Sequence, residues 1–258
     1  LQTLSSALAT HGRTMLIAAH GYDEGRETVL VHSLLEQRVD ALALIGLDHT
    51  AETLDQIDRQ GLPLVFLWNY RAGLDRPCIG FDNAEAGRLA ARHLIDLGHR
   101  EILFALGEER FNDRAASRRK GAFAAARKAQ MAVPAYRRLA CPYDIQASKN
   151  LIVDALDSTN PPSAVLAGND VIAQGAMFAA AAAGIKVPDE LSIIGIGDFG
   201  GLSAFEPGLT TLRIPARRIG QQAADTLVEM IDWPDTAFHH SHCCPLELIE
   251  RGTCQAIR

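Results

Sequence analysis

The sequence predicts an α/β fold in which mostly parallel sheets are flanked by helices. Short apolar runs alternate along the chain with longer segments of helical pattern. The chain has 258 residues, of which 48% are hydrophobic and 22% are charged. This is enough apolar material for one large core or for two cores of moderate size, so a division into two lobes is plausible.

Six apolar runs are the expected strands. Each is apolar throughout rather than alternating, as expected of a parallel strand that helices cover on both faces. The runs are residues 14–19, 41–46, 63–68, 101–107, 163–168 and 191–197.

The segments between these runs have the lengths of crossover helices. Gly61, Gly98 and Gly184 each follow a helical pattern, where a left-handed cap costs glycine no steric clash. Asp82 with Glu85 three residues later has the spacing of a capping box. Clear helical patterns are predicted over residues 24–38, 84–98 and 170–184.

Charge and cysteine content limit the possible partners and compartments. The formal net charge is −6, and the sequence contains no long Lys/Arg tract, so this chain by itself is not expected to bind DNA. No apolar run reaches the roughly 18 to 20 residues that span a bilayer, which predicts a soluble protein with no membrane partner. Five cysteines, an odd number without framework spacing, favour a reducing compartment, and we expect the cytoplasm.

One glycine pattern resembles a dinucleotide-binding loop. Gly195, Gly197 and Gly200 follow an apolar run with the spacing G-x-G-x-x-G. A pyrophosphate loop needs a helix directly after it, but Pro207 and Gly208 interrupt any helix of useful length. The glycines are therefore interpreted as a strand end with a close backbone approach, and no cofactor is predicted.

The run HHSHCC, from His239 to Cys244, invites a metal interpretation. In a strand, His240, His242 and Cys244 would share one face. A structural zinc site needs four convergent ligands, and no second cluster with metal spacing is evident. We therefore predict no metal site and interpret the run as a histidine-rich final strand.

Enzyme motifs are absent from the sequence. It contains no G-x-S-x-G elbow, no H-E-x-x-H and no phosphate loop that ends in G-K-S/T. Asp82, Asp113 and Asp198 could place carboxylates in one cleft, but binding proteins use such groups to orient hydroxyls without reaction. The prediction is a binding protein and not an enzyme, with a hydrolase or dehydrogenase as the weaker hypothesis.

Two arginines at the start of a predicted helix are candidate ligand-binding residues. Arg114 and Arg118 are four residues apart, so they share one face of a helix that is expected to begin at Asp113. A cation near a helix N-terminus costs about 0.3–1 kcal/mol unless an anion offsets it, and a bound carboxylate would do so. The alternative is solvated surface charge, which is expected for Arg119 and Lys120.

Two further residues have competing interpretations. Trp68 lies at a strand end, where its ring could form an apolar wall against a sugar-like ligand or simply pack in the core. Asp113 could accept hydrogen bonds from ligand hydroxyls, but a plain helix N-cap also explains it.

Three segments of the chain resemble the lactose-repressor (LacI/GalR) family. They are IGFDNAEAGRLAARHLIDLGHREILFALG (79–107), AVLAGNDVIAQGAMFAAAAAGIKVP (164–188) and the segment 187–227, which holds P-x-L-T-T and P-x-x-x-I-G patterns. These segments occur in the same order as in the family, and the resemblance extends from about Ala41 to Gly252. The turn Gly197-Asp198-Phe199 and the helix in residues 112–123 are most similar to the gluconate-utilisation repressors.

The resemblance implies a two-lobed fold of the periplasmic-binding-protein type. The lobes are expected to hold residues 1–81 with 213–236 and residues 82–212 with 237–258, joined by crossovers near 80–83, 210–214 and 234–240. The family's helix-turn-helix is absent from this sequence, and its first strand is expected to be missing ahead of the helix-like start LQTLSSALATHG. The resemblance also implies a homodimer that acts on operator DNA through the missing domain.

The resemblance assigns the effector to the space between the lobes and implies which residues contact it. Asp82, Arg118 and Asn169 occupy the family's ligand-contacting positions. Gly197 stands where relatives have an acid, so the role of Asp198 is left open. The expected function is control of operator binding by a small sugar or a gluconate-like sugar acid. A periplasmic sugar-binding protein of a transport system is the alternative.

Overall fold

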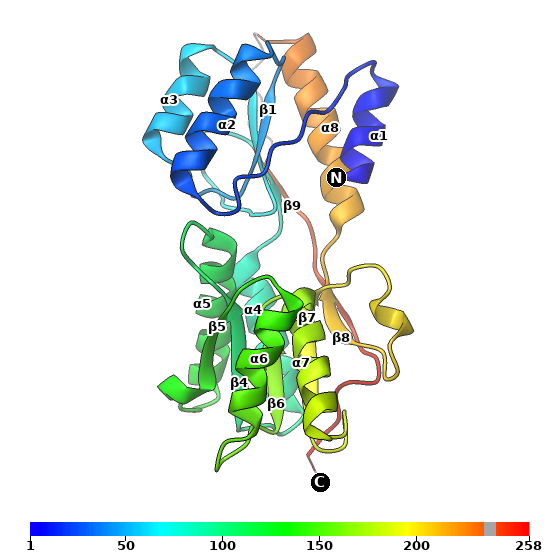
Figure 1. Cartoon of the computed structure of the whole chain (residues 1–258). Helices are drawn as coiled ribbons and strands as arrows, with labels where there is room; N and C mark the ends of the chain where they lie inside the picture. The colour runs from blue at the N-terminus through cyan, green and yellow to red at the C-terminus, as the bar shows by residue number, and fades with distance from the viewer. Residues whose placement is uncertain (235–240, 258) are drawn as a thin grey trace. The chain divides into compact units, whose positions relative to one another are not determined.

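The computed structural model describes residues 1–234 and 241–257, and the chain forms two compact units (Figure 1). The first unit comprises Leu1–Asp82, Arg110–Arg114 and Pro215–Pro245, and the second comprises Asn83–Glu109, Ala115–Ile214 and Leu246–Arg258. The crossover expected at 234–240 falls almost entirely on residues outside the described part of the chain. No described helix is long and apolar enough to cross a membrane.

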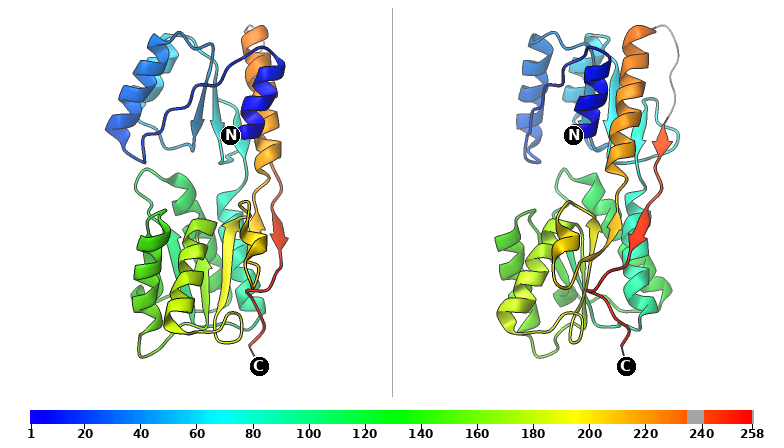
Figure 2. Two further views of the ribbon diagram at one scale, coloured as in Figure 1. Left: turned by 45° about the vertical axis from the view of Figure 1, so that its right-hand side comes forward. Right: turned by 90° about the vertical axis from the view of Figure 1, so that its right-hand side faces the viewer.

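The first unit is built on a parallel sheet of order β1-β2-β3-β9. Helix α8 packs on β2 and β3, and α1 lies alongside α8 (Figure 2). Helices α2 and α3 contact each other. The elements are α1 (Gln2–Thr10), α2 (Glu24–Glu36), β1 (Leu42–Ile45), α3 (Ala51–Arg59), β2 (Leu64–Leu67), β3 (Cys78–Gly80), α8 (Ala216–Asp232) and β9 (His242–Cys243).

The strand predicted over residues 14–19 does not form, so that prediction was wrong. The segment has no regular secondary structure, and Leu16 and Ile17 are exposed. An isolated extended segment is not a strand, because its N–H and C=O groups need a partner strand. Strand β1 is the end strand of the sheet in the described chain, and nothing there pairs with residues 14–19.

The second unit is built on a six-stranded sheet of order β10-β8-β7-β6-β4-β5, parallel except for the antiparallel pair β10–β8. Helices α6 and α7 pack together and share a core with the sheet, and α4 contacts β6, β7 and β8. The elements are α4 (Asn83–Asp96), β4 (Ile102–Gly107), α5 (Asp113–Lys128), η1 (Ala135–Arg137), β5 (Arg138–Cys141), α6 (Ile145–Leu156), β6 (Ala164–Ala167), α7 (Asp170–Ala183), β7 (Ser192–Gly197), η2 (Leu202–Ala204), β8 (Thr210–Arg213) and β10 (Glu247–Ile249).

The other sequence-predicted elements are confirmed within a few residues at their ends. The five remaining apolar runs are β1, β2, β4, β6 and β7, and the three helical patterns are α2, α4 and α7. Gly61, Gly98 and Gly184 have φ of 62°, 95° and 70°, the left-handed conformation that a helix cap requires. Four short strands, namely β3, β5, β8 and β10, were not predicted because their runs are too short to stand out. Strand β9 lies within the run interpreted as a histidine-rich final strand, although it is shorter than that run and β10 follows it.

A buried histidine ties the end of α4 to the rest of the second unit. His99 is 3% exposed, its Nδ1 lies 3.0 Å from Ser163 Oγ, and its Nε2 lies 3.0 Å from Ser192 Oγ. Burial lowers the pKa of His99, although a hydrogen bond to the backbone of Gln255 acts in the opposite direction. Burial therefore favours the neutral imidazole.

We expect the unfolding free energy to fall as the pH drops below about 6.5. The pKa of His99 is lower in the folded than in the unfolded protein, so the unfolded chain binds the proton first and stability is lost with acidification. One such proton changes stability by at most about 1.4 kcal/mol per pH unit. Urea unfolding at pH 7.5 and 5.5 measures the effect, which should be smaller in His99→Gln. An equal loss in that variant would assign the effect to other groups.

Candidate functional site

Arg118 lies at the carboxyl end of the second unit's parallel strands. Its side chain projects from α5, is 7% exposed, and donates from Nε to Asn83 Oδ1 at 2.9 Å. Its Nη1 donates to the carbonyl oxygen of Gly168, directly after β6, at 2.7 Å. The guanidinium thus joins the start of α4 to the end of β6, so the interpretation as solvated surface charge is wrong for this residue.

Two glycines bring α4 and α5 close enough to make this arrangement possible. A Cβ atom at Gly87 would collide with the backbone of Arg118, and one at Gly121 would collide with the backbone of Ala84. The two helices therefore meet backbone to backbone at this crossing. The close approach explains the glycine three residues after Arg118 and fixes where the guanidinium emerges.

Asn169 follows Gly168 at the same edge of the sheet. It is 9% exposed and caps α7, because its Oδ1 accepts a hydrogen bond from the Ile172 N–H at 2.9 Å. The next residue, Asp170, is the first residue of α7 rather than its cap. The turn Gly168-Asn169-Asp170 therefore places one amide side chain and one carboxylate at the end of β6.

Asp170 explains the glycine pattern that resembles a dinucleotide loop. Its fully buried carboxylate accepts from Thr211 Oγ1 at 2.7 Å and from the Phe199 N–H at 3.0 Å. A Cβ at Gly195 would collide with Asp170 Oδ1, and one at Gly197 would lie 2.8 Å from Oδ2. Only 3-10 segment η2 follows the loop, so the pattern makes room for a carboxylate of the protein itself.

Hydrogen bonding and burial have opposite effects on the pKa of Asp170. Burial raises the pKa of this carboxyl above its ordinary range, against the opposing effect of the hydrogen bonds from Thr211, Phe199 and Asp198. The group clamps the end of β7 to β8 and to the start of α7. Asp170 was not selected from the sequence, although an acid two residues after an apolar run was visible there.

Asp198 is held by two arginines of its own unit. Its Oδ2 accepts from Arg213 Nε at 2.7 Å and its Oδ1 from Arg251 Nη2 at 2.6 Å. Burial alone would raise the pKa of Asp198, but the hydrogen bonds and charges of Arg213 and Arg251 outweigh it, so that pKa lies below its ordinary value. Both carboxylate oxygens are engaged, and Asp198 has φ of 59°. This arrangement shapes the turn after Gly197.

In the first unit, Asp113 joins the loops that follow β1 and β2. Its Oδ2 accepts from the Leu47 N–H at 2.9 Å and from Asn69 Nδ2 at 2.5 Å. Neighbouring Trp68 is half-buried and has φ of 66°, an uncommon conformation for a large side chain that tends to occur at functional sites. Asn69 is 5% exposed and was not selected from the sequence.

Arg114 is folded against the same loops. Its Nη1 donates to the Ile45 carbonyl oxygen at 3.0 Å and lies 3.3 Å from Asp113 Oδ1, and its guanidinium is 5.7 Å from the ring centre of Tyr22. The cost of a cation at the start of α5 is thus offset by groups of the protein. Arg114 and Asp113 belong to the first unit, whereas α5 continues from Ala115 in the second. Arg119 and Lys120 are exposed, as expected.

Asp82, Cys243 and Cys244 occupy another part of the first unit. Asp82 is exposed after β3, and its backbone forms a hydrogen bond with Cys243, whose pKa is nevertheless raised by burial. Cys244 Sγ donates to Gln222 Oε1 at 3.1 Å. His239 and His240 lie outside the described residues. Within the described ranges, no three His, Cys, Asp or Glu side chains are placed to hold a metal ion.

Apart from Asp82, the candidate residues form one group in each unit. In the second unit, Arg118, Asn169 and the Gly197-Asp198 turn surround the carboxyl ends of β6 and β7. Tyr143, which sequence analysis missed, joins this edge after β5, because a Cβ at Gly107 would lie 2.5 Å from its hydroxyl oxygen. In the first unit, Asp113 and Arg114 lie with the loop that holds Trp68.

Comparisons with known proteins place this architecture among ligand-binding regulators. Residues 91–254 match the family model of the periplasmic binding protein-like domain. Over 231 residues, the chain is 30% identical to the HTH-type transcriptional regulator GntR of Escherichia coli K12, with 90% of this chain and 69% of that protein covered.

Solved structures of transcriptional regulators have the same fold. The transcription regulator GntR of Chromobacterium violaceum is 28% identical, with a TM-score of 0.87 over 98% of this chain and 92% of that one. A LacI family transcriptional regulator of Enterococcus faecium, solved with bound ribose, is 23% identical and has a TM-score of 0.85 over 100% of this chain and 93% of that one.

Proposed function

This chain belongs to the lactose-repressor (LacI/GalR) family of transcriptional regulators, and we propose that it senses a small polyhydroxylated acid, such as gluconate, to control operator binding. Operator DNA would be bound through a helix-turn-helix domain of the type that gives the relative its name. The proposed role is recognition without reaction, in the cytoplasm.

The observation that carries this proposal is the buried guanidinium of Arg118 at the carboxyl edge of the second unit's sheet. Ligands of α/β proteins commonly bind at this edge. An arginine suits a carboxylate, because its planar fork of donors matches the two oxygens. Asn169 stands one residue after the Gly168 carbonyl that holds Arg118, and an amide side chain suits a ligand hydroxyl.

We assign the remaining candidates smaller roles. Trp68, in the first unit, would offer an apolar face to the carbon backbone of a sugar-like ligand. Asp82, Asp113 and Arg114 would supply polar groups from the first unit. Asp198 is assigned to shaping the turn, because both of its carboxylate oxygens already accept hydrogen bonds from arginines.

The effector would act by its unequal affinity for two arrangements of the regulator. A ligand shifts a conformational equilibrium only by this difference in affinity. The effector class is inferred from Arg118 and from the resemblance to gluconate repressors. The ribose held by the Enterococcus regulator supports a sugar-like ligand.

Thermal unfolding with a panel of sugars tests the effector class. A true effector at about a hundred times its dissociation constant should add roughly 2.7 kcal/mol to the unfolding free energy. We expect gluconate or a related sugar acid to stabilise the protein, and glucose, its neutral counterpart of equal carbon number, to have little effect. Stabilisation by neutral sugars but by no acid would contradict the proposal.

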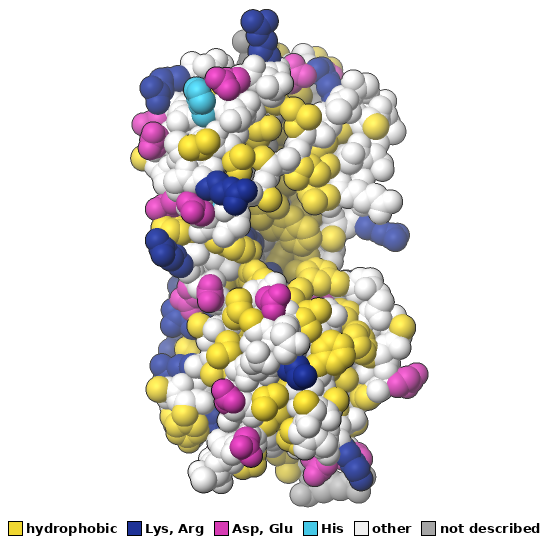
Figure 3. All heavy atoms as spheres, viewed as in Figure 1, with side chains coloured by type: hydrophobic (Ala, Val, Ile, Leu, Met, Phe, Trp, Pro, Cys, Tyr) yellow, Lys and Arg dark blue, Asp and Glu magenta, His cyan; other side chains and the backbone are white. Residues whose placement is uncertain are grey.

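We propose that the domain forms a homodimer through the outer face of α7. This helix contains one ionisable residue, Asp170, which is fully buried. Phe178, on its outer face, is 44% exposed and lies edge-on to Phe205, with ring centres 6.5 Å apart. Hydrophobic side chains gather over this helix (Figure 3). An uncharged face can meet its own copy about a two-fold axis without opposing like charges, despite the net charge of −6.

Phe178→Glu should convert the dimer to a monomer. The substitution places two like charges in the proposed interface and removes its largest apolar side chain. Sedimentation velocity measures the assembly state. Val29→Glu, at an exposed apolar residue of α2, is the matched control and should leave the dimer intact. A dimer that survives Phe178→Glu would place the interface elsewhere.

A further inference from the structure

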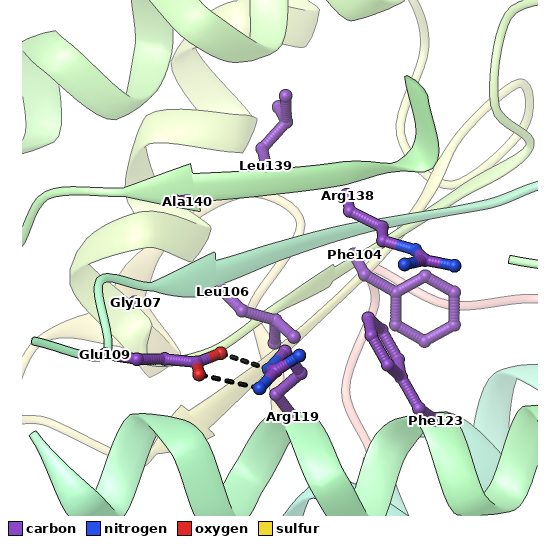
Figure 4. Close-up of a pocket in the computed structure, with 9 residues that line it drawn as sticks. All are labelled: Phe104, Leu106, Gly107, Glu109, Arg119, Phe123, Arg138, Leu139 and Ala140. Atoms are coloured by element: carbon purple, nitrogen blue, oxygen red, sulfur yellow. Dashed lines mark hydrogen bonds and ion pairs between the residues drawn. The ribbon is translucent and has the colours of Figure 1, made fainter. Parts of the chain in front are cut away.

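A cavity of about 270 Å³ lies in the second unit between α5 and the edge pair β4–β5 (Figure 4). None of the effector-site candidates lines it. Its floor is formed by Phe104 and Leu106 of β4, and its walls by Phe123 of α5 and Ala140 of β5. The cavity is therefore separate from the Arg118 site.

Strand register explains why the cavity exists. Phe104 pairs with Arg138 and Leu106 pairs with Ala140, so these four side chains share the face of the sheet toward α5. Leu139 points to the opposite face (Figure 4) and packs against the core shared with α6 and α7. Because β5 is the end strand and Ala140 is small and exposed, α5 does not cover this corner of the sheet.

The floor of the cavity is shaped for a flat apolar group. The rings of Phe104 and Phe123 lie edge to face, with centres 5.3 Å apart and an angle of 85° between planes. Aromatic rings prefer this edge-to-face geometry because faces and edges carry opposite partial charge, and a ligand ring could meet Phe123 in the same way. An engineered apolar cavity of about 150 Å³ holds benzene, so this volume accommodates one ring with a short substituent.

The rim of the cavity carries one excess positive charge. Arg119 pairs with Glu109, donating from Nη2 to Oε2 at 2.7 Å, so these two charges cancel. Arg138 lies with its guanidinium 5.2 Å from the Phe123 ring centre. Its Nε donates to the Val133 carbonyl oxygen at 2.8 Å and its Nη2 donates to the same oxygen, which leaves the edge formed by Nη1 and Nη2 to face a ligand. No carboxylate in the described part of the chain forms an ion pair with Arg138.

We propose that this cavity is a second ligand site, for a small carboxylate that carries a single aromatic ring. The ring would lie against Phe123 and the exposed Ala140, above the almost fully buried Phe104, and the carboxylate would pair with Arg138 at the rim. A bidentate pair between guanidinium and carboxylate supplies direction, while the apolar floor supplies most of the contact area. This inference is independent of the effector proposed above.

Fluorine NMR with 4-fluorophenylacetate tests the site. We expect saturable binding to the full chain with a dissociation constant below about 1 mM. Ala140→Leu fills the cavity from its exposed edge and should abolish binding. Arg138→Gln should weaken binding of the acid at least about fivefold and remove its advantage over neutral 4-fluorophenylacetamide. Arg127→Gln, at an exposed arginine of α5 that does not line the cavity, is the control and should bind normally.

Three results would overturn the proposal. They are the absence of saturable binding, binding that Ala140→Leu leaves intact, and equal affinity for the acid and the amide in the unaltered protein. Circular dichroism verifies that each variant is folded. The thermal response to sugar acids, measured on Ala140→Leu, separates the two sites, since this variant should keep the effector response whether or not the cavity binds a ligand.

Discussion

Arg118→Ala should abolish the stabilisation by effector and also lower the unfolding free energy of the unliganded domain. The first effect follows from loss of the proposed partner of the ligand's carboxylate. The second follows from the structure, because removal of the guanidinium leaves Asn83 Oδ1 and the Gly168 carbonyl without their buried donor. Hydrogen bonds to a charged group contribute about 1.5–3 kcal/mol each, so a loss of at least about 2 kcal/mol is expected.

Chemical denaturation with and without gluconate separates the two effects. Arg119→Ala is the matched control, since Arg119 is the next residue of α5 and is exposed beside Glu109. Surface ion pairs of this kind contribute about 0–1 kcal/mol, and the effector response should remain. If Arg118→Ala is destabilised but responds fully to gluconate, Arg118 supports the fold and does not bind the effector.

Gly121→Ala should be the most damaging single-methyl change in the second unit. The added Cβ would collide with the backbone of Ala84, and neither helix backbone can move aside as a flexible side chain would. Overpacking of this kind costs about 1–3 kcal/mol and sometimes more. Because the same crossing positions Arg118, the variant should also lose effector response.

A second helix glycine provides a control variant, for which the expected change in the unfolding free energy has the opposite sign. Gly25 lies in α2, and a Cβ there would meet only Asp23 Oδ1, at an ordinary 3.6 Å. Gly25→Ala should therefore stabilise the protein by up to about 1 kcal/mol through helix propensity alone. Urea unfolding of the two variants gives the comparison. Equal stability of Gly121→Ala and the unaltered chain would show that α4 and α5 can separate at no cost.

Some of the candidate site residues could be selected from the sequence, and others could not. Arg118 and Asn169 were selected because they lie in motifs that the resemblance covers. Three residues were missed, namely Asp170, Asn69 and Tyr143. The position of each depends on contacts with residues that are distant in the sequence, such as the Thr211 hydroxyl or Gly107. The glycines at 195 and 197 were interpreted from the sequence as a strand end with a close backbone approach. The group that they approach, the carboxylate of Asp170, was visible only in three dimensions.

The sequence by itself determined the alternation of strands and helices, their order and the caps at Gly61, Gly98 and Gly184. These features depend on hydrophobic periodicity and on backbone conformation, which are local properties. Only the tertiary structure decided which edge each strand occupies, that residues 14–19 have no strand partner, and that the cations at the start of α5 are bonded to groups of the protein. Pairing, burial and charge compensation depend on contacts between segments distant in the chain, and no local pattern records them.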